Sequence, residues 1–386
     1  MQEVNLIATT TFGLEAIAAH ELRLLGFPKQ SVENGRIMFR AAPEAIGLTN
    51  LWLRTAERVR LCMGEFTAAT FDELFEQTKA LPWSDWLPEN ACFPVDGKSI
   101  KSKLYSVPDC QAIVKKAVVE NMKKRYGRQW FPEDGPQYRI EVALLNDRVT
   151  LTIDTSGAGL HKRGYRTLIS DAPLKETLAA AMLYLARWYP DIALWDPFCG
   201  SGTIPIEAAM MGRGIAPGLH RQFAFQEWPG LSQSVFDEQR EAARAAVCTD
   251  PPDHIVGTDV DPDILRVARR NAQAAGVADD IHFQALPLAE IQTKQRYGKL
   301  VCNPPYGERL GTDAQVKSLY KDMGSVFRRF ETWSFYVLTA HEGFENLVGR
   351  RASKRRKLYN GNIKVDYYQY FGPRPPKPAR TTKTSQ

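Results

Sequence analysis

The sequence predicts an α/β protein of two domains, an α+β module over residues 1–160 followed by a doubly wound α/β domain over residues 161–372. Its 386 residues are too many for one ordinary core of about 100 to 200 residues. Short strands and helices mix before residue 160, whereas units of buried strand, glycine turn and helix follow one another from Ile192 onward. The segment 373–386 has few apolar residues, and we expect a disordered tail there.

Composition narrows the class of protein. Hydrophobic residues make up 44% of the chain and charged residues 24%, and no apolar run approaches the roughly 18 residues that span a bilayer. We therefore expect no membrane contact and a cytoplasmic location. The six cysteines form no CxxC pair and no HExxH occurs, so we expect neither a disulfide framework nor a metal site. The net charge of +6 suits a polyanionic partner but decides little by itself.

The N-terminal module contains one helix with a basic outer face. Between Asp109 and Tyr126, apolar residues recur at helical spacing and the cations lie largely off that stripe. Lys115, Lys116, Lys123 and Lys124 are the lysines of this outer face and are candidate phosphate contacts. A solvated helix face is the alternative interpretation. The alternating runs 138–145 and 149–154, joined by Asn146-Asp147-Arg148, predict a hairpin that closes the module.

The boundary between the domains falls in residues 157–166, GAGLHKRGYR, ahead of a helix expected over 172–189. Arg163 and Arg166 stand there between glycine and tyrosine. Their guanidinium groups are suited to binding phosphate groups or to fastening the domains.

The first motif of the second domain lies between a hydrophobic strand and a helix expected to begin near Pro205. It reads Asp196-Pro197-Phe198-Cys199-Gly200-Ser201-Gly202-Thr203. Such glycines let the backbone approach a ligand and present amides at a helix N-terminus. A proline stands at the third glycine of the dinucleotide fingerprint and no GKS or GKT follows, so neither NAD nor a P-loop nucleotide fits. The carboxylate of Asp196 suits the ammonium group of a methionine moiety and would repel a phosphate.

The second motif is Asp259, at the end of the strand HIVGTD, where a carboxylate can accept both hydroxyl hydrogens of a ribose. Asp261 is interpreted as the N-cap of a helix that starts at Pro262 and stops at Gly276. The distance from the glycine turn to Asp259 exceeds the dinucleotide pattern, and we interpret 220–253 as an insertion.

The third motif is Asn303-Pro304-Pro305-Tyr306, directly after an apolar strand. Two prolines fix the backbone and donate no hydrogen bond, so the Asn303 amide oxygen and the Pro304 carbonyl can both serve as acceptors. An exocyclic NH₂ group fits two such acceptors, which would point its lone pair at an incoming methyl group. Tyr306 can stack on a flipped-out base. Because Asn303 is neutral, the proton should leave only after methyl transfer.

Further along, WSFYVLTA and a hairpin at Asn360-Gly361 predict an antiparallel edge on the second sheet. The basic run 350–357 includes Arg355 and Arg356, which are candidate phosphate contacts or part of an exposed loop.

The segments DPFCGSGT, NPPYGERL, LHKRGYR and APLKETLAAAML resemble the THUMP-domain RNA methyltransferases, most closely the 23S rRNA guanine-N2 methyltransferases of RlmL type. This resemblance covers nearly the whole chain. It implies a THUMP-containing RNA-binding module over 1–160, a class I methyltransferase domain, S-adenosylmethionine as cofactor and no metal. The implied substrate is a guanine N2 amine of 23S rRNA, naked or in an assembling large subunit.

One feature departs from class I enzymes, which commonly hold the cofactor adenine with an acidic residue after the third strand. HFQALPLAEI has none before Glu290, which leaves Gln284 or backbone groups as candidates. Two other functions remain open: adenine-N6 methylation of RNA or DNA, because either amine fits the third motif, and an inactive RNA-binding ribosome assembly factor. Structured RNA is favoured over duplex DNA because the N-terminal module is basic and α+β.

Overall fold

The computed structural model describes residues 3–166, 174–250, 252, 254–305 and 313–376, and the chain forms two compact units. The first unit combines Met1–Gly164 with Ile215–Val247, and the second combines Tyr165–Gly214 with Cys248–Gln386. Most of the predicted insertion therefore belongs to the first unit and interrupts the stretch 161–372 that the sequence predicts as one continuous domain. The tail predicted over 373–386 falls outside the described residues beyond position 376.

The first unit is built on one seven-stranded sheet in the order β2-β3-β1-β4-β7-β6-β5. Its elements are β1 (Val4–Thr10), α1 (Glu15–Leu24), β2 (Gln30–Glu33), β3 (Arg36–Ala41), α2 (Ala45–Trp52), β4 (Ala56–Thr67), α3 (Phe71–Lys79), η1 (Trp83–Asp85), β5 (Val95–Ile100), α4 (Val107–Tyr126), β6 (Ile140–Leu145), β7 (Arg148–Asp154), η2 (Ala224–Glu227) and α7 (Gln233–Ala245). The long strand β4 pairs with β1 through its first half and with β7 through its second, which makes the sheet continuous.

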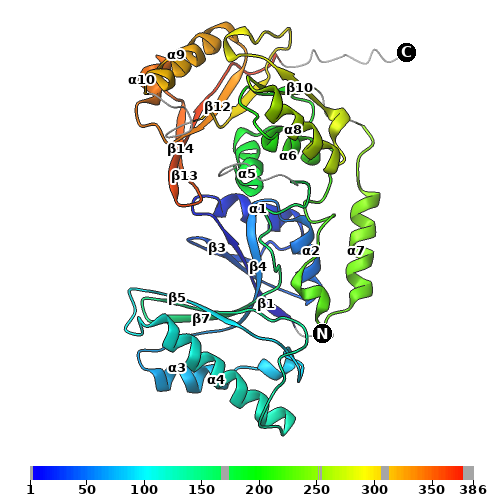
Figure 1. Ribbon diagram of the computed structural model, residues 1–386, viewed down its shortest axis with the longest axis vertical. Coiled ribbons are helices and arrows are strands. Elements are labelled where there is room, and N and C mark those ends of the chain that lie inside the picture. Colours follow the sequence, from blue (N-terminus) through cyan, green and yellow to red (C-terminus); the bar gives the residue numbers. More distant parts are fainter. Residues whose placement is uncertain (1–2, 167–173, 251, 253, 306–312, 377–386) are drawn as a thin grey trace, which may run out of the picture. The chain divides into compact units, whose positions relative to one another are not determined.

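The predicted local elements of this unit are confirmed. Helix α4 ends at Tyr126 and is capped by Gly127, whose φ of 68° permits the left-handed cap. The β6–β7 hairpin turns on Asn146 and Asp147, with φ of 52° and 62°, as two-residue hairpin turns of this hand require. Helices α3 and α4 lie side by side near the β5 end of the sheet (Figure 1).

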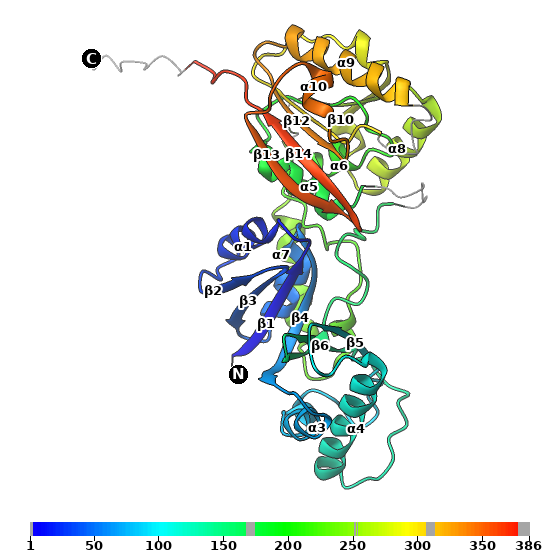
Figure 2. The ribbon, with the colours of Figure 1, turned by 90° about the vertical axis from the view of Figure 1, so that its left-hand side faces the viewer.

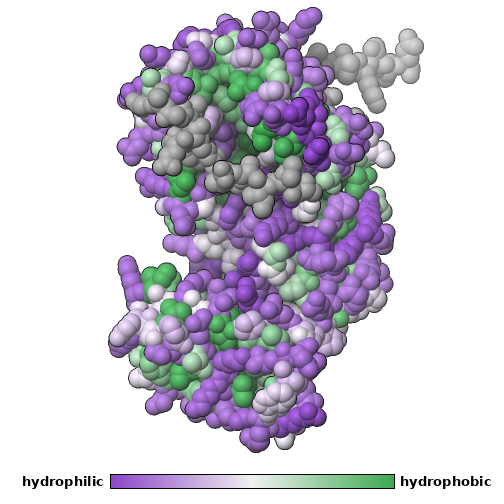
Figure 3. Space-filling model, viewed as in Figure 1, coloured by the Kyte–Doolittle hydropathy of each residue, from purple (hydrophilic) through white to green (hydrophobic). Residues whose placement is uncertain are grey.

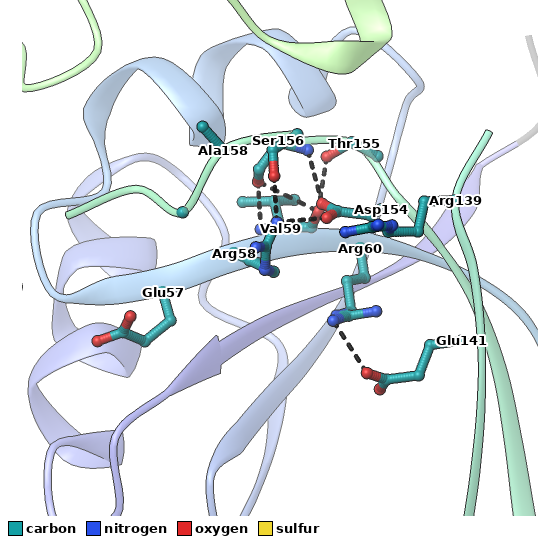
Figure 4. Close-up of polar contacts among 12 residues, drawn as sticks. Glu57, Arg58, Val59, Arg60, Arg139, Glu141, Asp154, Thr155, Ser156 and Ala158 are labelled. Carbon is teal, nitrogen blue, oxygen red and sulfur yellow. Dashed lines mark hydrogen bonds and ion pairs between the residues drawn. The ribbon is translucent and has the colours of Figure 1, made fainter. Parts of the chain in front are cut away.

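A polar network joins the ends of β4 and β7 (Figure 4). Arg58 pairs with the buried carboxylate of Asp154, which also accepts the backbone N–H of Ser156 at 2.9 Å. The Ser156 hydroxyl accepts the N–H of Val59 at 2.8 Å, and Arg60 pairs with Glu141 at 3.1 Å. These contacts satisfy polar groups that burial would otherwise penalise, and they fix the chain where it leaves β7.

Aromatic packing explains why the segment 215–247 belongs to the first unit. Trp228 is buried and stacks on Tyr138 with ring centroids 4.5 Å apart, and its indole N–H donates to the Gln137 carbonyl at 3.0 Å. Phe225 packs edge-on against Phe236 and donates its backbone N–H to the Thr155 carbonyl at 3.1 Å. Aromatic side chains that pack against residues distant in the sequence hold this segment in the first unit. Local sequence patterns around residue 220 therefore do not reveal that 215–247 belongs there.

The second unit carries another seven-stranded sheet, in the order β10-β9-β8-β11-β12-β14-β13. Its elements are α5 (Glu176–Ala186), β8 (Leu194–Asp196), α6 (Thr203–Gly212), β9 (Ile255–Asp259), α8 (Pro262–Ala274), η3 (Ala278–Asp280), β10 (Ile281–Ala285), η4 (Leu288–Glu290), β11 (Lys299–Cys302), α9 (Asp313–Arg329), β12 (Ser334–Thr339), α10 (Phe344–Val348), β13 (Lys354–Asn360) and β14 (Ile363–Tyr370). Strands β10 to β12 run parallel, and β14 and β13 add the predicted antiparallel edge (Figure 2).

The doubly wound prediction is thus confirmed, with β8 at the centre of the parallel strands. The chain proceeds from β8 to β9 and β10 on one side, and to β11 and β12 on the other. The carboxyl ends of β8, β9 and β11 therefore lie next to the point where the strand order reverses, where open α/β sheets bind ligands.

The core of this sheet is rich in aromatic residues. Phe327 and Phe335 stack with centroids 4.0 Å apart within one buried cluster. Hydrophilic residues predominate on the face of each unit that Figure 3 shows. Among the described residues, no helix is long and apolar enough to cross a membrane.

Candidate active site

A pocket of about 430 Å³ opens at the carboxyl ends of β8, β9 and β11, and we call it the carboxyl-end pocket. All three sequence motifs contribute to its lining. The lining residues are Leu174, Asp196, Pro197, Phe198, Cys199, Gly200, Ser201, Thr203, Ile204, Asp259, Val260, Asp261, Ile264, Leu288, Asn303, Pro305 and Leu319. Side chains from three separate strands therefore meet in one concave site, as a ligand pocket of this fold requires.

The first motif forms a tight turn between β8 and α6. Gly200 and Gly202 have φ of 52° and 86°, a conformation that side chains disfavour. A Cβ at Gly202 would also meet Ala268 and Phe283 at 3.1 and 3.2 Å. Helix α6 begins at Thr203, two residues before the predicted start, so its free N-terminal amides face the turn.

Asp196 is a buried carboxyl group at the end of β8. It is 1% exposed, and no described basic side chain pairs with it. The backbone N–H of Phe198 donates to it at 3.1 Å. Burial, with Asp259 nearby as a further cause, raises the pKa of Asp196 well above its usual value. A positively charged ligand group would reverse that penalty, because an opposite charge favours the ionised form.

Asp259 stands at the end of β9 with both oxygens turned to backbone donors. Its Oδ2 accepts the N–H of Gly200 at 3.0 Å, and its Oδ1 accepts that of Asp261 at 3.1 Å. Burial raises the pKa of Asp259. Each oxygen keeps lone-pair capacity for a further donor. Asp261 accepts the N–H of Asp263 at 2.8 Å, so its predicted capping role in α8 is confirmed.

Asn303 follows β11, and its amide oxygen accepts no hydrogen bond from any described residue. This oxygen, Oδ1, is buried. The adjacent Pro304 is buried, and Pro305 lines the pocket. Buried polar atoms in native proteins usually have a partner, so this acceptor at the pocket is available to a donor group of a ligand. Tyr306 lies outside the described residues.

Asn271 supports the glycine turn and was not predicted from the sequence. Asn271 is buried in α8 and donates from Nδ2 to the Ser201 carbonyl at 3.0 Å, which holds the glycine turn. Asn271 stands on the apolar face of α8, beside Leu265 and Ala268, and an amide within an apolar stripe is the signal that could have revealed it. Gln284 is exposed and is absent from the lining, whereas Leu288 supplies an apolar wall.

The two arginines of the predicted domain boundary are engaged within the protein. Arg163 is 3% exposed and donates to the carbonyls of Leu160 and Arg54 at 2.7 and 2.6 Å. This burial contradicts a phosphate contact by Arg163, so we do not carry that role forward. Arg166 donates to Thr203 Oγ1 at 2.6 Å and pairs with Glu176 at 3.5 Å, which ties α5 to the start of α6.

The other candidate RNA contacts differ in how they are neutralised. Lys115 pairs with Glu133 and Lys123 with Glu120, both at 2.8 Å. Lys116 lies over the Phe75 ring at 5.6 Å, and Lys124 is exposed without an acidic partner among the described residues. On β13, Arg355 pairs with Asp366 at 3.1 Å, and Arg356 has no described acidic partner.

Three features of the parallel sheet together define a class I methyltransferase. They are the glycine turn after β8, the acidic residue Asp259 at the end of β9, and the Asn-Pro-Pro sequence that follows β11. Residues 163–369 match the RMKL-like methyltransferase domain, residues 68–154 match the THUMP domain and residues 5–60 match the RlmL ferredoxin-like domain. The chain belongs to this RMKL-like methyltransferase family, and its cofactor is S-adenosylmethionine. The predicted resemblance, fold class and cofactor are confirmed.

Two relatives show how far the similarity extends. YpsC of Bacillus subtilis, whose name assigns it provisionally to the RNA methyltransferases, is 47% identical over 99% of both chains. A protein of Syntrophotalea carbinolica named ribosomal RNA large subunit methyltransferase K/L is 35% identical over 96% of this chain. That match covers 55% of the relative, so the chain spans about half the length of the K/L proteins it resembles.

Two solved structures are similar over almost the whole chain. One is a Listeria monocytogenes protein described as a predicted N6-adenine-specific DNA methylase, with 51% identity, 97% of each chain covered and a TM-score of 0.92. The other, SMU.472, was solved with S-adenosylhomocysteine, with 44% identity, 97% of this chain and 100% of that chain covered and a TM-score of 0.92.

Proposed function

We propose that this protein transfers a methyl group from S-adenosylmethionine to the exocyclic N2 amine of a guanine in 23S rRNA. The observation that supports it most is the buried Oδ1 of Asn303, which has no hydrogen-bond partner among the described residues and lies in the same pocket as the glycine turn and Asp259. The K/L names of relatives and the THUMP match favour ribosomal RNA as substrate and, with it, action in the cytoplasm.

In this proposal, the carboxyl-end pocket holds the methyl donor through two carboxylates. Asp196 binds the ammonium group, and Asp259 accepts the ribose hydroxyl hydrogens. The turn from Phe198 to Thr203 encloses the ligand between them. When bound, S-adenosylmethionine supplies an electrophilic methyl group. The apolar side chains of Leu288 and Ile264 offer a surface for a flat ring, which is our proposal for the adenine in place of Gln284.

Asn303 and Pro304 then position the acceptor base. The Asn303 amide oxygen and the Pro304 carbonyl accept the two hydrogens of the amine, which localises the nitrogen lone pair toward the methyl donor. Pro305 keeps this backbone rigid, and Tyr306 stacks on the base. Asn303 stays neutral, so the extra proton leaves the alkylated nitrogen afterwards, when that nitrogen is strongly acidic.

The RNA contacts of this proposal lie on both units. Lys115, Lys116, Lys123 and Lys124 on α4 face the RNA from the THUMP domain, and Arg355 and Arg356 do so from β13. Paired cations can exchange a carboxylate for a phosphate only at the cost of the ion pair, so Lys124 and Arg356 should contribute more than Lys115, Lys123 and Arg355.

Nucleoside mass spectrometry of ribosomal RNA from a deletion strain tests the target. We expect N2-methylguanosine to fall by one residue per 23S molecule and to return when the wild-type gene, but not the Asn303→Ala gene, is restored. Loss of N6-methyladenosine instead would establish the alternative that the Listeria description suggests, because the same two acceptors fit the adenine amine. Complete nucleoside profiles in the deletion strain would favour the inactive assembly factor.

A further inference from the structure

A second and larger cavity of the methyltransferase unit lies at the opposite ends of the parallel strands. It measures about 970 Å³, and we call it the amino-end cavity. Lys299, the first residue of β11, and Ser334, the first residue of β12, both line it. Asn303, which follows the other end of β11, lines the carboxyl-end pocket. The two cavities therefore lie at opposite ends of the parallel strands of one sheet, and they share no lining residue.

The amino-end cavity gathers cations that have no acidic partner among the described residues. Six arginine and lysine side chains line it, and none of them pairs with a described carboxylate. They are Arg187, Arg296, Lys299, Lys354, Arg356 and Arg374. Asp191 is the one acidic residue among its described lining residues. Like charges held together repel each other unless an anion compensates them, so the cluster favours a negatively charged ligand.

The strand β13 separates a paired arginine from an unpaired one. Arg355 points to one face of the sheet and pairs with Asp366 at 3.1 Å. Its neighbour Arg356 lines the amino-end cavity, and the buried Nε of Arg356 has no hydrogen-bond partner among the described residues. Successive side chains of a strand point to opposite faces, so the chain places its unneutralised guanidinium on the cavity side.

Lys299 adds a different contact at the base of the cavity. Its ammonium group donates to the carbonyls of Ala186 and Arg187, where α5 ends. Burial, followed by the charge of Arg187, lowers the pKa of Lys299 to about 8. Lys299 is thus engaged in holding α5, and an anion in the cavity would relieve the repulsion that Arg187 imposes on it.

The distribution of these groups matches an extended ligand better than a single phosphate. The cations come from the end of α5, the segment before β11, strand β13 and the segment after β14. Phe371, 49% exposed, lines the same cavity and offers a ring face to a base. Cations that follow a backbone beside an exposed aromatic ring are typical of single-stranded nucleic acid binding.

We propose that the amino-end cavity binds the phosphate backbone of a single-stranded segment of the RNA substrate. This inference rests on the proposed function, because it takes RNA as the substrate. It extends the contact proposed for Arg356 to a whole cavity of the methyltransferase unit, at the ends of the parallel strands opposite the carboxyl-end pocket.

Charge reversal in the cavity tests the proposal. Arg296→Glu with Lys354→Glu changes two exposed side chains that make no described hydrogen bond, and it lowers the formal net charge from +6 to +2, since each substitution removes two charges. The matched control is Arg270→Glu with Lys321→Glu, two exposed cations on α8 and α9 with the same change in net charge. The neutral pair Arg296→Gln with Lys354→Gln replaces the first variant if reversal lowers the yield of folded protein.

Binding of a labelled 23S rRNA fragment is measured over a series of salt concentrations. We expect the cavity variant to bind at least about tenfold more weakly at low salt, with the slope of log affinity against log salt reduced by about 1 to 2. The control should stay within about threefold of wild type. Affinity for S-adenosylmethionine should be unchanged in both, because neither pair lines the carboxyl-end pocket.

Equal RNA affinity and equal salt slope in the cavity and control variants would overturn this inference while leaving the proposed function intact. A second outcome would also overturn it: inorganic phosphate or free nucleotide binds the cavity, but the cavity and control variants bind RNA equally well. The cavity would then be a site for a small anion. Failure of wild-type protein to bind or methylate rRNA would instead overturn the proposed function, and this inference with it.

Discussion

Replacing Asn303 by alanine should separate stability from catalysis. The Oδ1 of Asn303 is buried without a described donor, and an unsatisfied buried polar group costs about 1 to 3 kcal/mol. Alanine removes that cost and loses some packing, so we expect the free energy of unfolding to stay equal or to rise by about 1 kcal/mol. Loss of one preorganised acceptor should nevertheless raise the barrier to methyl transfer by about 3 kcal/mol, which is on the order of a hundredfold in rate.

Single-turnover methylation of an rRNA fragment measures the rate, with denaturant unfolding and S-adenosylmethionine calorimetry on the same preparations. Asn271→Ala is the matched control, because the Oδ1 of Asn271 is likewise buried without a described donor, whereas its Nδ2 donates to the Ser201 carbonyl at 3.0 Å and alanine breaks that hydrogen bond. It should lower stability by about 1 kcal/mol and weaken cofactor binding. An Asn303→Ala protein that methylates within threefold of wild type, or that is less stable than Asn271→Ala, would refute the reasoning.

Three further predictions concern the cofactor and the fold. Asp259→Ala should weaken S-adenosylmethionine binding by about 1.5 to 3 kcal/mol in calorimetry, and unchanged affinity would remove Asp259 from the site. Burial raises the pKa of Asp196, so ionisation of this carboxyl group lowers the stability of the unliganded protein as pH rises through that pKa. Binding of the cofactor's ammonium group, in contrast, needs the ionised carboxylate. The increase in Tm caused by the cofactor should therefore be larger at about pH 8 than at about pH 5, and a pH-independent increase would contradict the role of Asp196. Trp228→Ala should lower the free energy of unfolding by about 3 to 5 kcal/mol through the lost stack on Tyr138, and denaturant unfolding that changes by less than 1 kcal/mol would show that 215–247 does not stabilise the first unit.

Local chemistry made many features predictable from the sequence. Asp261 and Gly276 bracket α8 because side-chain capping and a left-handed glycine act within a few residues. The turns at Asn146-Asp147 and Asn360-Gly361 follow from the preference of such residues for positive φ or tight turns. The three motifs were predictable as neighbours because the carboxyl ends of parallel strands share one sheet edge.

The tertiary structure alone decided which charged side chains are free. Arg163 looks like an RNA contact in the sequence, yet the fold buries it against carbonyls of Leu160 and of the distant Arg54. Whether a cation is neutralised depends on partners such as Asp366 for Arg355, which strand pairing brings close.

The sequence likewise does not show which unit holds 215–247, since Trp228 finds its partners Gln137 and Tyr138 about 90 residues earlier in the chain. The amino-end cavity assembles cations from α5, β13 and the segments around β11 and β14. Periodicity and motif spacing report contacts that are local in sequence or fixed by strand order. Packing between distant segments depends on shape and burial summed over many residues, and only the folded chain reveals it.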